Sequence, residues 1–313
     1  MNQPPDLSII IVNWNVRELL RDCLNSIDSR RGGMALEVIV VDSASSDGSA
    51  AMLAADFPWV TLIACDENVG FPRGNNLGIA KANGRYILLL NPDTAVVDDA
   101  LTTLFTYLQG QPDVGIVGAQ LLNGDGSVQS SRRRFPTLAT AFFESTWLQP
   151  LAPPRLLARY YVRDLPDDQT ADVDWVTGAC MMAPRTAVEA IGGLDEAYFM
   201  YSEELDWCRR FKDAGWRVVY LPTAQIIHYE GKSSEQAVVA RHINFQRAKL
   251  RYFRKYHSRL AAGLLRSFLL LNYLAQLVVE AVKGLLGHKR PLRRQRVRAY
   301  WAVLRSGLRP AGY

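Results

Sequence analysis

The sequence predicts an α/β protein in which a mainly parallel sheet is flanked by helices and followed by a helical extension at the C-terminus. Three observations predict this arrangement. Apolar runs rich in β-branched residues alternate with helical spacing through the first 120 residues, which is typical of parallel βαβ units. A long apolar segment lies near the C-terminus. The 313 residues are 49% hydrophobic and 21% charged, so the chain is neither disordered nor fibrous and can bury a large core.

The first 120 residues contain five predicted strands. These are residues 7–12, 38–41, 60–64, 86–90 and 114–117. The segments with helical spacing between them are 16–29, 74–82 and 98–109. A polar turn, SASSDGS, follows the second strand.

The middle of the chain has a different character. Asn123–Gly126 predicts a hairpin turn, and residues 130–170, with several Pro and the basic run Arg132–Arg134, are expected to be irregular. The later predicted elements are a strand over 172–183, an amphipathic helix over 203–213, and short strands over 217–221 and 225–227.

Charge is divided unevenly along the chain. Residues 241–313 hold 17 of the 36 Lys and Arg residues and one of the 31 acidic residues, Glu280. Residues 1–240 therefore carry a formal net charge of −11, and the last 73 residues carry +16. Such a split indicates a basic tail that meets an anionic surface, either a membrane or a nucleic acid.

Residues 260–287 of this tail are strongly apolar, with polar residues on one side only. At about 100° per residue, the polar residues share an arc of about 120° that runs from Arg266 to Asn272 and includes Glu280. This predicts a helix that lies in a membrane interface or packs on protein, because charges near the centre of a membrane span are costly. We expect either association with an anionic membrane or a homodimer. Nucleic-acid binding ranks last, since it needs no long apolar stretch.

The cytoplasm is the expected compartment. A signal peptide requires a basic region before its apolar run, and the N-terminus has none. The four Cys are spread along the chain without a CxxC pair. Together with the tail, this predicts a peripheral protein on the inner face of the plasma membrane.

Polar residues follow three of the predicted strands. They are Asn13–Asn15, Asp42 and Asn91–Asp93. In open α/β sheets, ligands bind beyond the carboxyl ends of the strands. Asp42 suits hydrogen bonds to a nucleoside, and Asp93 suits a divalent cation that holds a diphosphate. Asp is also common in turns and at helix caps, so a purely structural role is the alternative for both residues.

Further acids gather in FMYSEELDWCRR, residues 199–210, where Glu203, Glu204 and Asp206 stand at a predicted helix start. Acids there interact favourably with the helix dipole. Their mutual repulsion would also raise one pKa, as a general base requires. His228 follows an apolar strand, where a lone His is more often structural than a metal ligand.

The ordered motifs resemble those of family 2 glycosyltransferases with a GT-A fold, especially bacterial rhamnosyltransferases. They are SIIIVNWN, VVDSASSDGS, NVGFPRGNNLGI, LLLNPD, WVTGACMM, FMYSEELDWCRR and IIHYEGKS. The likeness covers about residues 7–250. It implies a Rossmann-like, mixed and mainly parallel sheet, with a catalytic domain over 1–240 and a tail over 241–313.

The resemblance also implies roles for individual residues. Those near the nucleotide-sugar are Asp42, Gly70, Arg73, Asn76 and Asn91. Those implied as ligands of Mg²⁺ or Mn²⁺ are Asp93 and His228. Those beside the donor sugar and acceptor are Trp175 and Gly178. The pair Glu203–Glu204 matches the family's Glu-Asp pair, whose second member is the catalytic base.

Two positions depart from the family pattern. The DxD motif is Asn91-Pro92-Asp93, so only Asp93 offers a carboxylate. The base position holds Glu204, one methylene longer than Asp, and catalysis is sensitive to such displacement. The backbone compensates, or Asp206 or Glu203 serves instead.

The implied activity is inverting transfer of a sugar in cell-wall or polysaccharide biosynthesis. The expected donor is dTDP-L-rhamnose, and the expected acceptor is a polyprenyl-linked sugar or a growing glycan. A UDP-galactofuranose or UDP-hexose donor is the nearest alternative. A non-catalytic scaffold that binds nucleotide-sugars is the alternative from another class.

Overall fold

The computed structural model describes residues 3–144, 146–229, 231 and 234–309. The chain forms two compact units. The first comprises Met1–Phe135, Tyr161–Phe199 and Glu203–Ser233, and the second comprises Pro136–Tyr160, Met200–Ser202 and Ser234–Tyr313. The predicted boundary at residue 240 thus differs from this division, because residues 136–160 join the second unit.

The first unit is built on a mixed sheet with the strand order β3-β2-β1-β4-β11-β6-β12-β5 among the described residues. Its strands are β1 (Leu7–Asn13), β2 (Leu36–Asp42), β3 (Val60–Ala64), β4 (Tyr86–Leu90), β5 (Thr94–Val96), β6 (Val114–Leu122), β7 (Val128–Gln129), β9 (Ala171–Asp172), β11 (Cys180–Pro184) and β12 (Arg217–His228). A separate antiparallel pair consists of β8 (Arg132–Arg133) and β10 (Trp175–Val176).

Most of the sheet is parallel. β1 pairs in parallel with β2 and β4, β2 with β3, and β6 with β12. β11 runs antiparallel between β4 and β6, and the short strands β5, β7 and β9 also pair antiparallel. The strands β1, β2, β4 and β12 therefore end at one edge of the sheet. The predicted α/β class with a mainly parallel sheet is confirmed.

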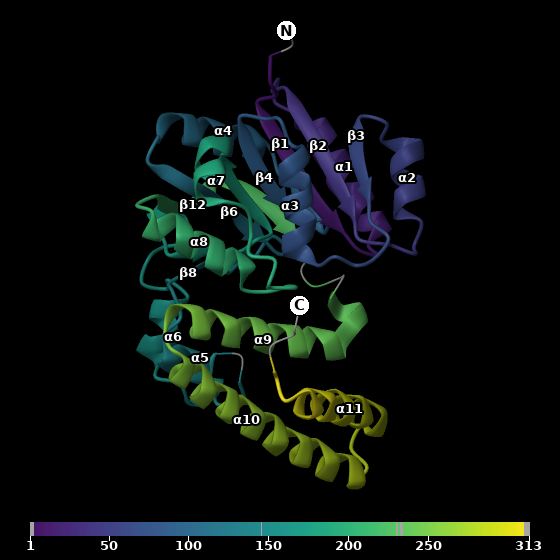
Figure 1. The fold of residues 1–313 in the computed structure, drawn as a ribbon, viewed down its shortest axis with the longest axis vertical. Helices are drawn as coiled ribbons and strands as arrows, with labels where there is room; N and C mark the ends of the chain where they lie inside the picture. Colours follow the sequence, from purple (N-terminus) through teal and green to yellow (C-terminus); the bar gives the residue numbers. More distant parts are fainter. Residues whose placement is uncertain (1–2, 145, 230, 232–233, 310–313) are drawn as a thin grey trace. The chain divides into compact units, whose positions relative to one another are not determined.

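Helices cover both faces of this sheet (Figure 1). They are α1 (Arg17–Ser29), α2 (Ser49–Asp56), α3 (Phe71–Lys81), α4 (Ala100–Gly110), α7 (Arg185–Ile191) and α8 (Glu203–Asp213). α1 buries Leu20, Leu24 and Ile27, which recur at helical spacing. α3 can approach β1 closely because Gly78 has no side chain. A Cβ at this position would lie 2.4 Å from the Ile10 side chain.

Two predictions about the middle of the chain are wrong in detail. The two short strands predicted after residue 216 are the single strand β12, which keeps its pairing with β6 across a register shift between Leu221 and Gln225. Pro222 interrupts the local pattern there, but pairing with a neighbouring strand carries the chain through. The strand predicted over 172–183 is divided into β9, β10 and β11 because its parts pair with different partners.

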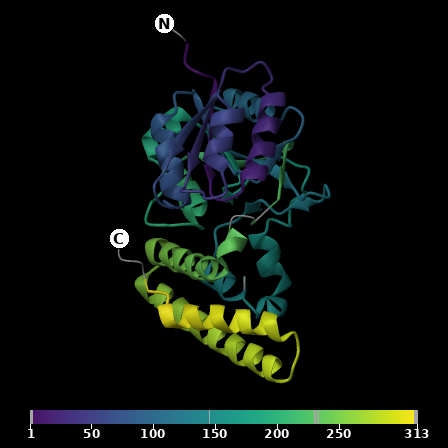
Figure 2. The same cartoon turned by 90° about the vertical axis from the view of Figure 1, so that its right-hand side faces the viewer.

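The second unit is helical. Its elements are α5 (Leu138–Phe143), the 3-10 turns Gln149–Leu151 and Ser234–Ala237, α6 (Pro154–Tyr160), α9 (Val238–Tyr256), α10 (Arg259–Leu285) and α11 (Arg290–Ser306). The region predicted to be irregular thus contains α5 and α6. α10 and α11 run side by side in both ribbon views (Figures 1 and 2).

Residues 136–160 belong to this unit because they pack on its long helices. The rings of Phe142 and Phe268 meet edge to face, with centroids 4.7 Å apart, and Lys249 Nζ lies 2.9 Å from Glu144 Oε2. These partners are far apart in sequence, so no local pattern announces them. By length and composition, α10 is long and apolar enough to cross a membrane.

Candidate active site

The ends of β1 and β2 hold a buried polar pair. Asn13 and Asp42 are directly opposite in the strand register, and Asn13 Nδ2 donates a hydrogen bond to Asp42 Oδ1 at 2.8 Å. The backbone N–H of Ser45 donates to Asp42 Oδ2 at 3.0 Å. These two donors hold the Asp42 carboxylate at the sheet edge where the predicted nucleotide-sugar would bind.

The start of α3 is held by a close approach at Gly70. Its φ is +78°, and a Cβ would lie 2.5 Å from the Phe199 carbonyl oxygen, so this position requires glycine. Arg73, one turn further on, is exposed and lies 3.6 Å from Glu67. Asn76 instead binds protein: it accepts from the Leu194 N–H at 2.8 Å and donates to the Leu194 carbonyl at 2.9 Å. Its predicted contact with the donor stays a prediction.

The predicted metal ligands lie together. Asp93 follows β4 and His228 ends β12; both are buried, and His228 Nε2 is 3.4 Å from Asp93 Oδ1. Pairing of His228 with Thr94 across β12 and β5 produces this proximity. Asn91 Nδ2 is also 3.4 Å from His228 Nε2. Residues 230, 232 and 233 of the IIHYEGKS motif lie outside the described residues.

The chemistry of this pair suits a divalent cation. Gln129 Oε1 lies 2.8 Å from His228 Nδ1; because that oxygen only accepts, the hydrogen bond assigns the proton to Nδ1 and leaves the Nε2 lone pair facing Asp93. Asn91 Oδ1 is buried and accepts no hydrogen bond from the described residues. Among those residues, no group of three His, Cys, Asp or Glu side chains is arranged so that it could hold a metal ion, so a donor diphosphate would have to complete the coordination.

The three acids at the start of α8 have different surroundings. Asp206 is fully buried, and its Oδ2 accepts from Arg210 Nε at 3.0 Å. Glu203 is buried, and its pKa is raised well above the ordinary value by burial and by the charge of Glu204. Glu204 is half-buried, and its Oε2, like Oε2 of Glu203, accepts no hydrogen bond from the described residues. Burial raises the Glu204 pKa to about 7.

Glu204 is linked to the end of β4 through one short loop. A Cβ on Gly178 would lie 3.5 Å from Glu204 Cβ, and the carbonyl of the next residue, Ala179, accepts from the Asn91 N–H at 3.0 Å. Trp175 of the same segment is buried, and its Nε1 donates to the Arg134 carbonyl at 3.1 Å. The fold thus brings the acid cluster close to the Asn91–Asp93 turn.

Arg133 is a site residue that the sequence analysis did not assign. Its positive charge partly opposes the rise in the Glu204 pKa. The guanidinium lies 4.6 Å from the centre of the Tyr161 ring and 5.9 Å from that of Trp175. The basic run Arg132–Arg134 was the only signal in the sequence. Gln129, the partner of His228, had none, because the two residues are 99 positions apart.

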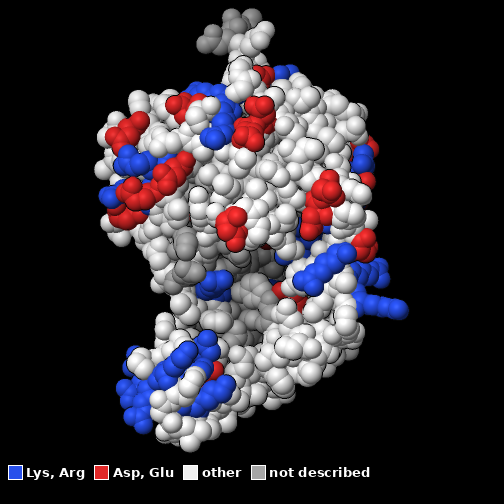
Figure 3. Space-filling model, turned by 180° about the vertical axis from the view of Figure 1, so that it is seen from behind, with Lys and Arg blue, Asp and Glu red and all other residues white. Residues whose placement is uncertain are grey.

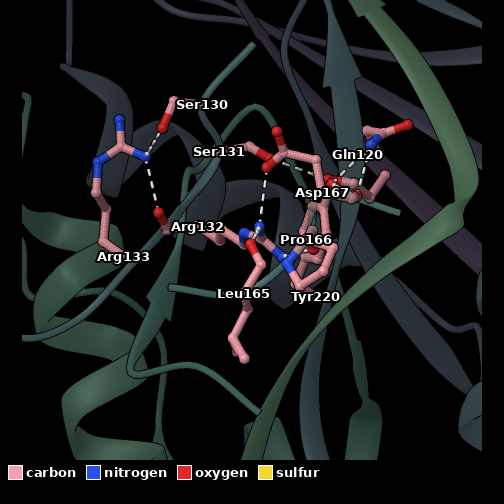
Figure 4. A network of polar contacts seen from close by, with 10 residues as sticks. Gln120, Ser130, Ser131, Arg132, Arg133, Leu165, Pro166, Asp167 and Tyr220 are labelled. Carbon is pink, nitrogen blue, oxygen red and sulfur yellow. Dashed lines mark hydrogen bonds and ion pairs between the residues drawn. The ribbon is translucent and has the colours of Figure 1, made fainter. Parts of the chain in front are cut away.

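The neighbouring Arg132 points to the other side of β8 (Figure 4). It is buried, and its guanidinium donates to the carbonyls of Leu165 and Pro166 and to Asp167 Oδ1 at 2.7–2.9 Å. The Tyr220 ring centre is 4.6 Å away. Because side chains alternate along a strand, anchoring Arg132 on one side directs Arg133 to the other.

Comparison with known proteins decides the family. The sequence profile of glycosyl transferase family 2 matches residues 8–191, which is more than half of the chain. The chain belongs to glycosyl transferase family 2. It is therefore a glycosyltransferase, and the resemblance predicted from the ordered motifs is confirmed.

Proteins similar to this chain include rhamnosyltransferases and a hexosyltransferase. An N-acetylglucosaminyl-diphospho-decaprenol L-rhamnosyltransferase of Mycobacterium tuberculosis is 28% identical over 64% of this chain and 68% of its own length. Agl10 of Haloferax volcanii is a hexosyltransferase of low-salt glycan biosynthesis. It is 30% identical over 71% of this chain and 67% of its own length. Rhamnosyltransferase WbbL of Escherichia coli is 29% identical over 51% and 61%.

Solved structures confirm the GT-A fold. The mannosyltransferase PcManGT of Pyrobaculum calidifontis, in complex with GDP-Man and Mn²⁺, superposes with a TM-score of 0.55 and 17% identity over 98% of this chain and 86% of its own. GalNAc-T7 with UDP, GalNAc and Mn²⁺ superposes with a TM-score of 0.55 and 13% identity. The match covers 78% of this chain and 48% of GalNAc-T7, so this chain spans about half of it. Such neighbours bind Mn²⁺ with a nucleotide or nucleotide-sugar, which is consistent with a divalent metal here.

Proposed function

We propose that this glycosyltransferase transfers L-rhamnose from dTDP-L-rhamnose, with inversion, to a polyprenyl-diphosphate-linked sugar or a growing surface glycan. Similarity to the mycobacterial and E. coli rhamnosyltransferases supports the donor. The name of the mycobacterial relative supports a lipid-linked acceptor. The observation that carries the proposal is the Glu204 carboxyl, which has a raised pKa and an oxygen without a hydrogen-bond donor. Glu204 also lies beside Gly178, whose neighbour Ala179 accepts a hydrogen bond from the Asn91 N–H.

Glu204 is the proposed general base. A base works best with a pKa near the working pH, and the Glu204 pKa of about 7 meets this condition. As the acceptor hydroxyl oxygen attacks the anomeric carbon, Glu204 takes its proton, and the bond from that carbon to the diphosphate oxygen breaks on the opposite face. Asp206 is less suited, because its carboxylate already binds Arg210.

Asp93 and His228 are the proposed protein ligands of Mg²⁺ or Mn²⁺. When bound, the metal would neutralise charge on the leaving nucleoside diphosphate. Gln129 holds the His228 ring so that Nε2 faces the site. Asp42 is proposed to accept hydrogen bonds from the nucleoside, with Gly70 and Arg73 beside the donor.

The test is a donor screen with the full chain, Mn²⁺ or Mg²⁺, and polyprenyl-diphosphate N-acetylglucosamine as acceptor. Transfer from dTDP-L-rhamnose in preference to UDP-galactofuranose, UDP-hexoses and GDP-mannose supports the proposal. Agl10 is named a hexosyltransferase, so a hexose is the nearest alternative. Preference for a UDP-hexose would replace the rhamnosyl donor but keep the glycosyltransferase activity. Donor binding without transfer or hydrolysis for any sugar would favour a non-catalytic scaffold.

A further inference from the structure

α10 differs from an ordinary surface helix, because a wide aliphatic side of it faces solvent. The buried side of α10 holds the apolar residues Leu265, Leu269 and Tyr273. It also holds two residues of the polar arc, Asn272 and Glu280, which are 5% and 6% exposed. The opposite arc carries large aliphatic side chains that lie in the open. Leu271 is 65% exposed and Leu285 is 81% exposed, and the same side includes Leu260, Leu264, Val278 and Val282.

The buried polar groups have specific partners within the second unit. Glu280 accepts from Arg293 Nη1 of α11 at 2.6 Å, and Arg266 Nε donates to the Gly307 carbonyl at 2.7 Å. The Tyr273 hydroxyl lies 3.1 Å from His242 Nδ1 of α9. Rotating α10 to hide its apolar arc would break these bonds and leave buried charges unpaired, which is costly. The outward orientation of the apolar arc is therefore set by the unit's own packing.

The charges near this surface have one sign. The exposed basic residues include Lys283, Lys289, Arg290, Arg294, Arg298 and Arg305. Glu280, the single acid of residues 241–313, is buried in its ion pair. Figure 3 shows the Lys and Arg side chains gathered over the helical unit, with white surface beside them. The surface is thus an aliphatic strip beside exposed cations, without an exposed acid among its described residues.

We propose that α10 lies in the plane of an anionic lipid bilayer, with its aliphatic arc among the acyl chains and the basic residues of α11 and its flanking turn at the headgroups. An in-plane helix needs one apolar face and cationic flanks, and both are present. A second copy of this chain fits less well, because pairing two such surfaces would bring like charges together. A membrane span would carry the Glu280–Arg293 pair and Arg266 into hydrocarbon.

The first experiment is flotation of the full chain with vesicles of phosphatidylcholine and phosphatidylglycerol, and with phosphatidylcholine alone. We expect strong binding to the anionic vesicles that weakens as salt is raised, because screening shortens the reach of surface charges. No donor or acceptor is present, so the outcome does not depend on the proposed activity. Equal binding to neutral vesicles, or no binding to either, would overturn the proposal.

Paired variants separate the two contributions. Leu271→Gln with Leu285→Gln should reduce binding to anionic vesicles at least tenfold, because both side chains are mostly exposed and contribute apolar area only when covered. Arg294→Gln with Arg298→Gln should reduce it roughly 25-fold, at roughly fivefold for each cation near the surface. Arg30→Gln with Lys81→Gln, an equal loss of exposed charge in the first unit, is the matched control and should leave binding unchanged.

Two further measurements distinguish the other occupants. Circular dichroism must show that each variant is folded. Light scattering in the absence of lipid should find the same mass for the wild type and the Leu271/Leu285 variant. If that variant dissociates a dimer and the wild type binds no vesicle, the surface is a self-interface and the proposal fails. Bound protein that resists both high salt and alkaline extraction would indicate a span and also overturn it.

Discussion

The helices α1 and α10 are both amphipathic, and they bury opposite sides. α1 packs Leu20 and Leu24 into the core of the first unit and leaves Glu18 in solvent. α10 buries Asn272 and Glu280 together with Leu265, Leu269 and Tyr273, and leaves its wide aliphatic side open. The comparison teaches that periodicity defines two sides of a helix, whereas the partners available on neighbouring helices decide which side is buried.

The pKa values of two glutamates, Glu204 of the first unit and Glu280 of the second, are shifted in opposite directions. Burial raises the pKa of Glu204, which lacks a donor for one carboxylate oxygen. For Glu280, burial also opposes ionisation, but the hydrogen bond and charge of Arg293, with the charge of Arg296, outweigh it and lower the pKa. The first carboxyl has the pKa that the proposed general base requires, and the second belongs to a structural ion pair. The following predictions break or sharpen this comparison.

The largest effect is expected at Asp93. Asp93→Ala removes the carboxylate next to His228 Nε2, so transfer and metal-stimulated donor binding should both be lost while the fold remains. Calorimetric titration of donor with and without Mn²⁺ measures the binding. Full transfer by the wild type in excess EDTA would show that no metal is needed.

Glu204→Gln keeps the size of the side chain and removes its basicity. Loss of a general base typically lowers the rate about 10²–10⁴-fold, and donor affinity should hardly change. Steady-state kinetics at saturating donor measures the rate. Asp206→Asn is the companion variant: if it is inactive but folded while Glu204→Gln is near wild type, the base is Asp206.

The rate of transfer should rise with pH through about 7. The Glu204 pKa is about 7, so the carboxylate that accepts the proton forms above this pH, and the rate should fall about tenfold for each pH unit below it. The same raised pKa favours the folded state at low pH, and that contribution is lost as pH rises through 7. Glu204→Gln should therefore raise the melting temperature more at pH 8 than at pH 5.

Glu280→Gln should have the opposite effect on stability. The lowered pKa of Glu280 contributes stability above its unfolded pKa of about 4.5, and that contribution is lost as pH falls through the lower folded value. We expect a loss of about 1.5–3 kcal/mol at pH 7, typical of a hydrogen bond to a charged partner, and a smaller loss at pH 3. Urea unfolding at both pH values measures this. Transfer to a soluble acceptor should be unchanged.

The smallest effect is expected at Gln129, which acts through His228. Gln129→Leu leaves Nδ1 without its acceptor, so the ring should lose its preferred orientation and Mn²⁺ affinity in the presence of donor should fall about tenfold. Gln129→Glu, which keeps an acceptor at this position, should restore most of it. Mn²⁺ titration followed by electron paramagnetic resonance provides a measurement independent of transfer.

The alternation of strands and helices could be predicted from the sequence, because each element depends on the periodicity of consecutive residues. Strands β3 and β4 and helix α8 have the predicted bounds, and the polar residues Asp42 and Asp93 stand at strand ends as expected. The ordered motifs also indicated the family. The two sides of α10 were likewise evident from spacing alone.

Tertiary structure decided everything that depends on partners distant in the chain. It placed β11 antiparallel between β4 and β6, set Gln129 on His228, and gave Asp206 an arginine while one Glu204 oxygen remained without a donor. It also turned the aliphatic side of α10 outward, because the partners of Glu280 and Arg266 lie in α11 and its C-terminal turn. A local pattern carries periodicity, but pairing energies across tens of residues exist only in the fold.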